Sequence, residues 1–386
     1  MRHIVICWEL GEGLGHLVSM SKIVEELTRQ GYKVTCILKD ITMAHKILGR
    51  FRTEWLAAPR IYLRNPIPAP INHAEVLFNT GYRDADSIAS LLIGWRTIFS
   101  ALKPDRIICE YAPTAGLAGK ALGIDVICID SGFSTPPLRV RPDDRLPPIR
   151  HTPSVTEDRL RESELNVLGM VNRARWMVGD AELVRFSDIF NSKVLYRNWT
   201  EFNHFGMHSP ELHMGQIFGD SGGVRPEWPA NGLPRVFAYL KPNHPESLPV
   251  LRAALACGYQ VVAYLPGFPD SVLSELCQNP RIMVSPLPFN LNELPEDIQL
   301  GIWHSATGGI ARCLDKGMRM IFLPMHPEQY LAAMAVRGAG LPAYVSVNPE
   351  AWPAVFQEIQ TWPRHRLNNC WKPADIEQLA HRLVNS

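Results

Sequence analysis

The chain has 386 residues, of which 46% are hydrophobic and 20% are charged; this is a globular composition, and the length suits two domains of roughly 150 to 200 residues each. Its 39 lysine and arginine residues balance 38 aspartate and glutamate residues. This balance provides no net field that would attract a nucleic acid, so we expect no nucleic-acid partner.

The first half of the chain alternates short apolar runs with stretches of helical periodicity. Strands are predicted at residues 3–10, 33–38, 105–111 and 125–130, with helices at 17–30 and 115–122. Strands that alternate with helices in this way form parallel sheets. Residues 135–215 are less regular, contain amphipathic stretches at 159–169 and 171–185, and complete a first domain predicted for residues 1–215.

A turn-rich stretch, residues 216–234, is predicted to be a linker, and the same rhythm resumes after it. Strands are predicted at 235–240, 260–265, 281–285, 300–305 and 318–324, with helices around 249–257 and 309–316. The second domain is predicted for residues 235–370, and residues 371–386 form a final helix positioned to pack back on the first domain. The prediction is an α/β fold with two Rossmann-like domains that face each other across a cleft, without a detectable sequence repeat.

Glycines follow the first predicted strand in the sequence GEGLGH, at Gly11, Gly13 and Gly15, and His16 stands where a helix begins. Such glycines let a strand turn sharply into a helix and let a ligand approach the backbone. The spacing lacks the last glycine of a dinucleotide-binding fingerprint. His16 is a candidate general base at the edge of the sheet, and Glu110, at the end of a later strand, is a candidate to orient it. The alternatives are a structural hydrogen bond for His16, and for Glu110 a helix cap or a pair with an arginine.

A second group of polar residues lies between residues 304 and 329. His304 ends an apolar strand, Thr307, Gly308 and Gly309 open a helix, and Glu328 and Gln329 follow the next strand. This arrangement predicts a diphosphate on the amides at the helix start, with His304 donating to a phosphate oxygen. Glu328 and Gln329 would then hold sugar hydroxyls. The alternative is an ordinary strand–helix–strand unit whose glycines permit tight turns.

The second group resembles the donor signature of the GT-B glycosyltransferases, in the family of plant and bacterial natural-product glycosyltransferases that use UDP- or dTDP-sugars. The matching positions are His304, Gly308, Gly317, Pro324, Glu328 and Gln329. The first domain agrees in GEGLGHLVSMSKIVEELTRQGYKVT, and in KPDRIICEY with the AGKALGIDVICI that follows.

The resemblance implies an inverting, metal-independent hexosyltransferase-type enzyme with no cofactor beyond its nucleotide-sugar co-substrate. It implies that His16 is the general base and that Glu110 stands where the family often has Asp. It also implies that Gly13 and Gly15 join the donor site. The acceptor is a small molecule or a lipid-linked one, which the sequence does not identify.

Two segments depart from the family pattern. His304-Ser305-Ala306 replaces His-Gly-Gly, and Lys241-Pro242 replaces Gly-Ser, which makes Lys241 a candidate phosphate contact. Phe289 and Asn290 are candidates for recognising the nucleobase. These departures motivate one alternative, a non-catalytic GT-B relative that acts as a partner or activator of another enzyme. A sugar-nucleotide epimerase is the less favoured third alternative.

The remaining features point to a reducing cellular compartment. The eight cysteines form no Cys-x-x-Cys pair, no basic leader precedes an apolar core, and no stretch of about 18 apolar residues occurs. We therefore expect a cytoplasmic protein, with peripheral membrane contact left open. His204, His208 and His213 lack a zinc-ligand spacing, and Trp8, Trp95 and Trp176 are candidates for either the core or an acceptor groove.

Overall fold

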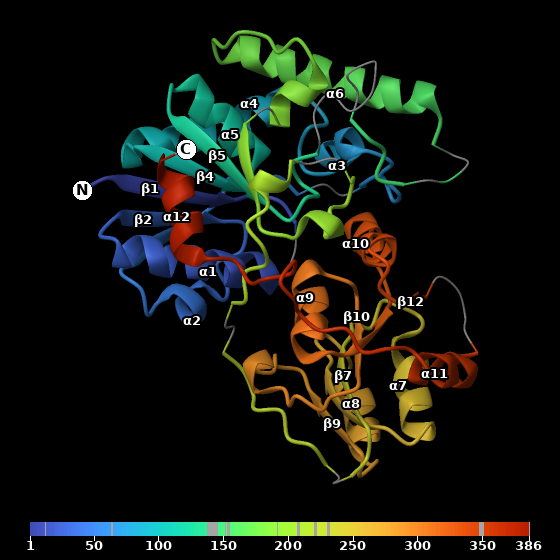
Figure 1. Ribbon diagram of the computed structural model, residues 1–386. Coiled ribbons are helices and arrows are strands. Elements are labelled where there is room, and N and C mark those ends of the chain that lie inside the picture. Colours follow the sequence, from blue (N-terminus) through green and yellow to red (C-terminus); the bar gives the residue numbers. More distant parts are fainter. Residues whose placement is uncertain are drawn as a thin grey trace. The chain divides into compact units, whose positions relative to one another are not determined.

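The computed structural model describes residues 1–11, 13–62, 65–136, 146–150, 152, 155–190, 192–206, 209–219, 222–229, 232–346 and 351–385. The chain divides into two compact units (Figure 1). The first unit comprises Met1–Thr200, Met207–Ile217 and Ala374–Ser386, and the second comprises Glu201–Gly206 and Phe218–Pro373.

The first unit is built on a six-stranded parallel sheet in the order β3-β2-β1-β4-β5-β6. Its strands are β1 (His3–Trp8), β2 (Lys33–Leu38), β3 (Thr53–Ala57), β4 (Arg106–Glu110), β5 (Asp125–Asp130) and β6 (Lys193–Tyr196). Its helices are α1 (Leu14–Arg29), α2 (Ala44–Leu48), α3 (His73–Phe78), α4 (Ala85–Leu102), α5 (Pro113–Ala121), α6 (Glu157–Met177) and α12 (Ile376–Asn385), with 3-10 turns η1 (Phe186–Phe190), η2 (Thr200–Phe202) and η3 (Pro210–Leu212). The turn η2 runs into the second unit.

The apolar runs become strands because helices cover the sheet. Every residue of β1 is buried, as is typical of a central parallel strand. One face of β1 packs with α1 in a core that also contains Leu379 and Leu383 of the strongly amphipathic α12. Figure 1 shows this C-terminal helix in red beside the first strands. The final segment of the chain therefore belongs to the first unit.

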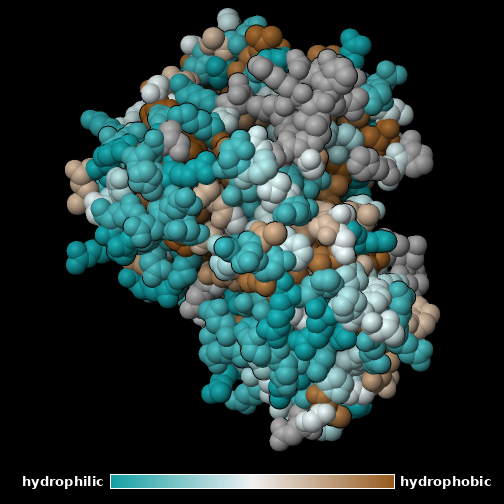
Figure 2. Space-filling view, in the orientation of Figure 1, coloured by the Kyte–Doolittle hydropathy of each residue, from teal (hydrophilic) through white to brown (hydrophobic). Residues whose placement is uncertain are grey.

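The two predicted amphipathic stretches at 159–169 and 171–185 are in fact one helix, α6, followed by irregular chain. Thr156 caps its start by accepting a hydrogen bond from the Arg159 amide. Gly169 does not break the helix, because a single glycine costs a helix only about 1 kcal/mol relative to alanine. Leu165, Met170 and Trp176 are exposed on α6, and apolar patches appear in Figure 2 where Figure 1 draws this helix.

The second unit repeats the design in a six-stranded parallel sheet of order β12-β11-β10-β7-β8-β9. Its strands are β7 (Arg235–Tyr239), β8 (Gln260–Tyr264), β9 (Ile282–Ser285), β10 (Leu300–Trp303), β11 (Arg319–Phe322) and β12 (Ala343–Val345). Its helices are α7 (Ser247–Ala256), α8 (Asp270–Cys277), α9 (Thr307–Lys316), α10 (Pro327–Gly338) and α11 (Trp352–Gln360), with the 3-10 turn η4 (Leu291–Glu293).

Numbered from its own first strand, each sheet has the order 3-2-1-4-5-6, which is that of the Rossmann fold. The predicted α/β class with two Rossmann-like domains is thus confirmed. In each sheet the strand order reverses between the first and fourth strands, β1 and β4 or β7 and β10. Ligands of such sheets bind outside the carboxyl ends of the strands at this reversal. Among the described residues, no helix is both long and apolar enough to cross a membrane.

Candidate active site

The turn from β1 into α1 depends on glycine. Gly11 has φ +80° and Gly13, the N-cap of α1, has φ +95°, a region that other residues rarely adopt. The Leu10 amide donates to the Tyr111 carbonyl at 2.9 Å, and Lys39 Nζ donates to the Gly11 carbonyl at 2.6 Å. These bonds fix the turn against the carboxyl ends of β4 and β2.

His16 and Glu110, predicted as a pair although 94 residues apart in the sequence, are in contact. His16 lies in the first turn of α1, and its Nδ1 is 2.8 Å from Oε1 and 2.7 Å from Oε2 of Glu110, the last residue of β4. The contact follows from the topology, because β1 and β4 are neighbours and Trp8 is in register with Glu110. A carboxylate only accepts, so His16 Nδ1 donates and Nε2 is left as the basic atom.

Arg197 is the third member of this cluster, and sequence reasoning missed it. Its Nη2 donates to Glu110 Oε1 at 2.8 Å. Burial by itself would raise the pKa of Glu110, but the charges and hydrogen bonds of His16 and Arg197 outweigh it and lower that pKa to about 2. Glu110 is therefore a carboxylate throughout the neutral range.

The imidazole ring is held on its other sides as well. It stacks on Trp8 with centroids 5.2 Å apart and planes 20° apart, and Trp8 Nε1 donates to the Leu10 carbonyl at 2.6 Å. A Cβ on Gly11 would lie only 2.6 Å from His16 Nε2. The side chain of His16 is 12% accessible and that of Glu110 only 3%. His16, which carries the basic Nε2, is thus the more accessible residue of the pair that it forms with Glu110.

In the second unit, His304 follows β10 and bridges three strand ends. Its Nδ1 donates to the Leu323 carbonyl at 2.7 Å, and its Nε2 accepts from the Lys241 amide at 2.7 Å. Burial lowers the pKa of His304 to about 4, and the nearby His244 and Lys241 act in the same direction. The ring is therefore neutral with both nitrogens bonded to backbone, and it does not provide the phosphate hydrogen bond predicted from the sequence.

Ser305 occupies the place of the family's first glycine and keeps a glycine-like backbone, with φ +59°. It is fully buried, and its hydroxyl lies 2.6 Å from the His304 carbonyl and 2.7 Å from the Gln329 carbonyl, to which it donates. The hydroxyl thereby ties the turn after β10 to the start of α10. The serine in place of the family's glycine therefore keeps the left-handed backbone of this turn and adds a hydroxyl that bonds to the Gln329 carbonyl.

The predicted phosphate-binding position is the start of α9. Its N-cap, Ala306, makes no side-chain capping bond. Thr307 is its first residue, Gly308 has open space where a Cβ would stand, and a Cβ on Gly309 would collide with Trp303. The glycine at 308 thus borders space that a ligand could fill, and the glycine at 309 serves the packing of α9 on β10. In the first unit, Gly13 and Gly15 also border open space.

The other predicted donor residues take different positions. Glu328 and Gln329 are half-buried in the first turn of α10, where Gln329 Oε1 accepts from the Met325 amide at 2.8 Å. Lys241 is half-buried, two residues after the end of β7. Phe289 is 1% exposed and packs edge-on against Phe237, so its ring is not available to stack on a nucleobase. Asn290 instead caps η4 by accepting from the Asn292 amide.

The remaining histidines and tryptophans are mostly structural. His204 is buried and His213 stacks on Tyr196, while His208 lies outside the described residues. Trp95 is fully buried beside Phe99. Trp176 is 75% exposed on α6.

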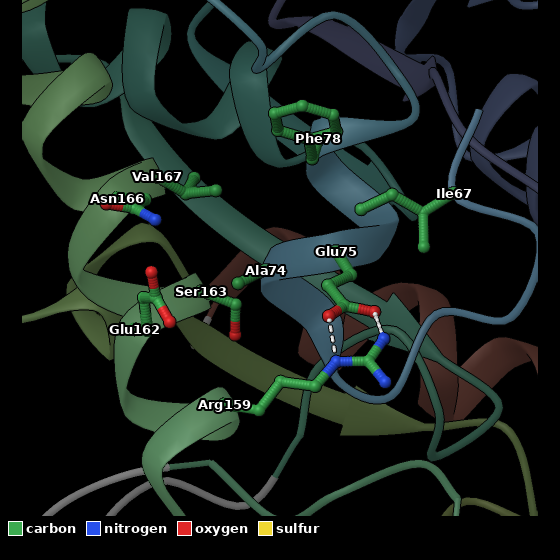
Figure 3. A pocket seen from close by; sticks show the side chains of 9 residues that line it. All are labelled: Ile67, Ala74, Glu75, Phe78, Arg159, Glu162, Ser163, Asn166 and Val167. Atoms are coloured by element: carbon green, nitrogen blue, oxygen red, sulfur yellow. Dashed lines mark hydrogen bonds and ion pairs between the residues drawn. The ribbon is translucent and has the colours of Figure 1, made fainter. Parts of the chain in front are cut away.

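A cavity of about 210 Å³ opens between α3 and α6 in the first unit (Figure 3). It is lined by Ile67, Ala74, Glu75, Phe78, Arg159, Glu162, Ser163, Asn166 and Val167. At its edge Arg159 pairs with Glu75 through two bonds of 3.0 and 2.9 Å. The lining combines apolar side chains with a few polar groups, and the cavity is smaller than most small-molecule sites.

Two Rossmann-like domains, each with polar residues at the reversal of its strand order, define the GT-B class of fold. No protein-family model and no curated protein matches the chain. Among solved structures, the chain is similar to the glycosyltransferase VinC, solved with dTDP, at 12% identity and a TM-score of 0.68, covering 99% of this chain and 98% of that one.

The calicheamicin glycosyltransferase CalG4 is similar at 14% identity and a TM-score of 0.64, over 99% of this chain and 93% of that one. The glycosyltransferase SnogD of Streptomyces nogalater is similar at 16% identity and a TM-score of 0.61, over 100% of this chain and 99% of that one. At these identities, the likeness establishes the fold over essentially the whole chain.

Proposed function

We propose that this protein is a glycosyltransferase that moves a sugar from a nucleoside-diphosphate donor to a hydroxyl or amine of an acceptor. The observation that carries the proposal is the His16–Glu110 pair, with contacts of 2.7 and 2.8 Å at the strand-order reversal of the first sheet. The solved glycosyltransferases of the same fold support it, and VinC and the spinosyn rhamnosyltransferase SpnG were solved with thymidine diphosphate. A dTDP- or UDP-sugar is therefore the donor we propose.

The pair suits direct displacement with inversion. His16 Nε2 takes the proton of the acceptor hydroxyl while the acceptor oxygen bonds to the anomeric carbon from the face opposite the diphosphate. The bond from that carbon to the diphosphate oxygen breaks, and its electrons leave with the diphosphate. Glu110, held as a carboxylate, stabilises the imidazolium through Nδ1.

The leaving diphosphate needs positive groups, and the second unit offers them at the carboxyl edge of its sheet. The first amides of α9 carry the partial positive charge of a helix start, and Gly308 leaves room for a phosphate oxygen to approach. Lys241, two residues after β7, adds a full charge. His304 takes a positioning role here, because its ring bonds the Lys241 amide. Glu328 and Gln329 remain our candidates for holding sugar hydroxyls.

The cavity between α3 and α6 is our candidate for the acceptor. His73, the first residue of α3, donates from Nε2 to the Phe133 carbonyl at 2.8 Å, and the Phe133 ring packs edge-on against Tyr111, which follows Glu110. The cavity thus shares one run of packed residues with the segment that carries Glu110. Asn166→Trp should fill the cavity from the exposed face of α6, raising KM for the acceptor while leaving donor binding unchanged.

The test is turnover with a panel of UDP- and dTDP-sugars and candidate acceptors, followed by mass spectrometry of the products. His16→Ala should lower kcat by about 10²- to 10⁴-fold, the usual contribution of a general base. His45→Ala is the matched control, because His45 is an exposed histidine of the same unit. Transfer that survives His16→Ala unchanged would eliminate the proposed base. Conversion of the donor without any acceptor would point to the epimerase.

A second candidate function is a non-catalytic GT-B relative that assists another enzyme. It is favoured by His304, because both ring nitrogens of that residue are hydrogen-bonded to backbone and neither is left for a phosphate. Melting curves with UDP and dTDP separate the two. A ligand at 100 times its Kd stabilises the folded state by about 2.7 kcal/mol, a shift readily seen by thermal melting. Failure of every nucleotide to move the melting temperature, together with a stable complex with another protein, would favour the assisting role.

A further inference from the structure

Arg197 is placed beside Glu110 by the edge strand of the first sheet. It directly follows β6, and its amide donates to the Asp130 carbonyl at 2.7 Å, which extends the β5–β6 ladder to the carboxyl edge. The residue is 7% exposed. Its Nη2 reaches Glu110 Oε1, the same oxygen that His16 Nδ1 contacts, each at 2.8 Å. A fixed cation therefore shares an oxygen with the ring of the proposed base.

Burying the Arg197 guanidinium costs free energy. Within the described part of the chain, its Nε is buried and has no hydrogen-bond partner. A buried N–H without a partner costs free energy, and a buried ion pair is weak evidence for stabilisation. A neutral donor at this position would orient the Glu110 carboxylate without that cost. The feature that only a cation provides is its charge.

That charge acts on the His16 ring in two ways. It neutralises Glu110, so the ring faces a balanced ion pair instead of a lone anion, and it repels a proton on the ring directly. The other charged groups at this edge are directed elsewhere. Lys39 donates to the Gly11 carbonyl, Glu9 accepts from the Thr114 amide, and Asp130 accepts from the Gly132 and Ser134 amides.

We propose that Arg197 is a positioning residue that opposes protonation of His16 and so keeps Nε2 free to accept a proton at lower pH than a simple His–Glu pair would allow. The proposal rests on the proposed function, in which His16 is the base. Without Arg197, Glu110 would hold the ring as imidazolium over more of the neutral range, and the ring would no longer accept the acceptor's proton.

The experiment measures hydrogen–deuterium exchange at Cε1 of each histidine by peptide mass spectrometry, as a function of pH, in the full chain. This readout follows ring protonation and needs no turnover. In Arg197→Met the midpoint for His16 should move up by about one to two pH units, as expected for loss of a charge this close. The acid limb of the kcat/KM profile should move with it. Arg197→Lys, which keeps the charge, should return both toward the wild-type values.

Two controls separate charge from folding. Arg106→Met removes a buried arginine from the opposite end of β4, the strand that carries Glu110; Arg106 pairs there with Asp125, and its loss should leave the His16 midpoint unchanged. The exposed His45 provides an internal reference in every sample. If Arg197→Met is too unstable, Arg197→Gln at low temperature gives the same comparison.

A His16 midpoint that stays fixed in Arg197→Met, or that moves equally in Arg106→Met, would overturn the proposal. A midpoint that moves as expected in a protein that transfers no sugar would instead uphold the role of Arg197 on the ring and count against the proposed function. The two ideas can therefore fail separately.

Discussion

Gly11→Ala should lower kcat/KM strongly. Its loss of folding stability should be little more than that of an alanine substitution at another glycine with positive φ. Gly11 has φ +80°, and its new Cβ would lie 2.6 Å from His16 Nε2, 2.9 Å from Cε1 and 3.2 Å from Tyr111 Cδ1. The left-handed backbone alone costs about 1–2 kcal/mol for a residue with a side chain. The ring cannot retreat freely, because it is bonded to Glu110 and stacked on Trp8. Displacement by about 1 Å is expected to lower kcat/KM by about 100-fold.

The matched control is Gly31→Ala. Gly31 has φ +86°, and a Cβ added there would meet nothing within 4 Å, so it bears the backbone cost without a collision. Both variants should melt a few degrees lower, at about 2–4 °C per kcal/mol for a unit of this size. Only Gly11→Ala should lose activity in steady-state assays with the active donor. Equal losses of kcat/KM in the two variants, or full activity in Gly11→Ala, would refute the reasoning.

Three further substitutions probe buried groups by melting. Burial raises the pKa of Glu9 to about 7 from 4.5, so the folded state loses stability as pH rises through that window, and Glu9→Gln should raise Tm at pH 8 but not below pH 4.5. Burial lowers the pKa of His304 from 6.5 to about 4, so here the folded state loses stability as the pH falls. The pH-dependent part of the unfolding free energy, about 3 kcal/mol, is fully present above pH 6.5 and is lost as the pH falls to 4. His304→Gln should flatten that decline. Phe289→Leu should lower stability by about 1 kcal/mol and leave nucleotide affinity by calorimetry unchanged, because the ring is in the core; weaker binding without lost stability would return Phe289 to the nucleobase site.

The sequence predicted the central strands of both sheets because burial on two faces demands uninterrupted apolar residues. The strands it missed, β3, β6 and β12, all lie at sheet edges. In β3 no residue is fully buried, and Glu54 and Leu56 face solvent together, so neither an apolar run nor a clean alternation appears. The apolar pattern reflects burial, and of the four edge strands only β9 was recognised from it.

The same limit applies to the site. His16 and Glu110 were predictable because each ends or follows a central strand, and the topology of a parallel sheet brings those ends together. Arg197 follows the unrecognised β6, so no motif pointed to it. The role of His304 was misjudged for another reason: spacing gives the position of a ring but not its hydrogen-bond partners. Only the three strand ends that meet at His304 reveal that both nitrogens bond to backbone.

A polar residue stands at the end of the fourth strand of each unit: Glu110 is the last residue of β4, and His304 directly follows β10. The next residue in each case is a non-glycine residue in the left-handed region, Tyr111 at φ +47° and Ser305 at φ +59°. Such a residue costs of order 1–3 kcal/mol and persists where neighbours hold it. The Tyr111 carbonyl accepts from the Leu10 amide, and the Ser305 hydroxyl donates to the Gln329 carbonyl. In both units the strained residue thus joins the end of its strand to a neighbouring segment of the proposed site. Strain held at the same topological position in two domains without detectable sequence repetition therefore supports the proposed ligand sites at both edges.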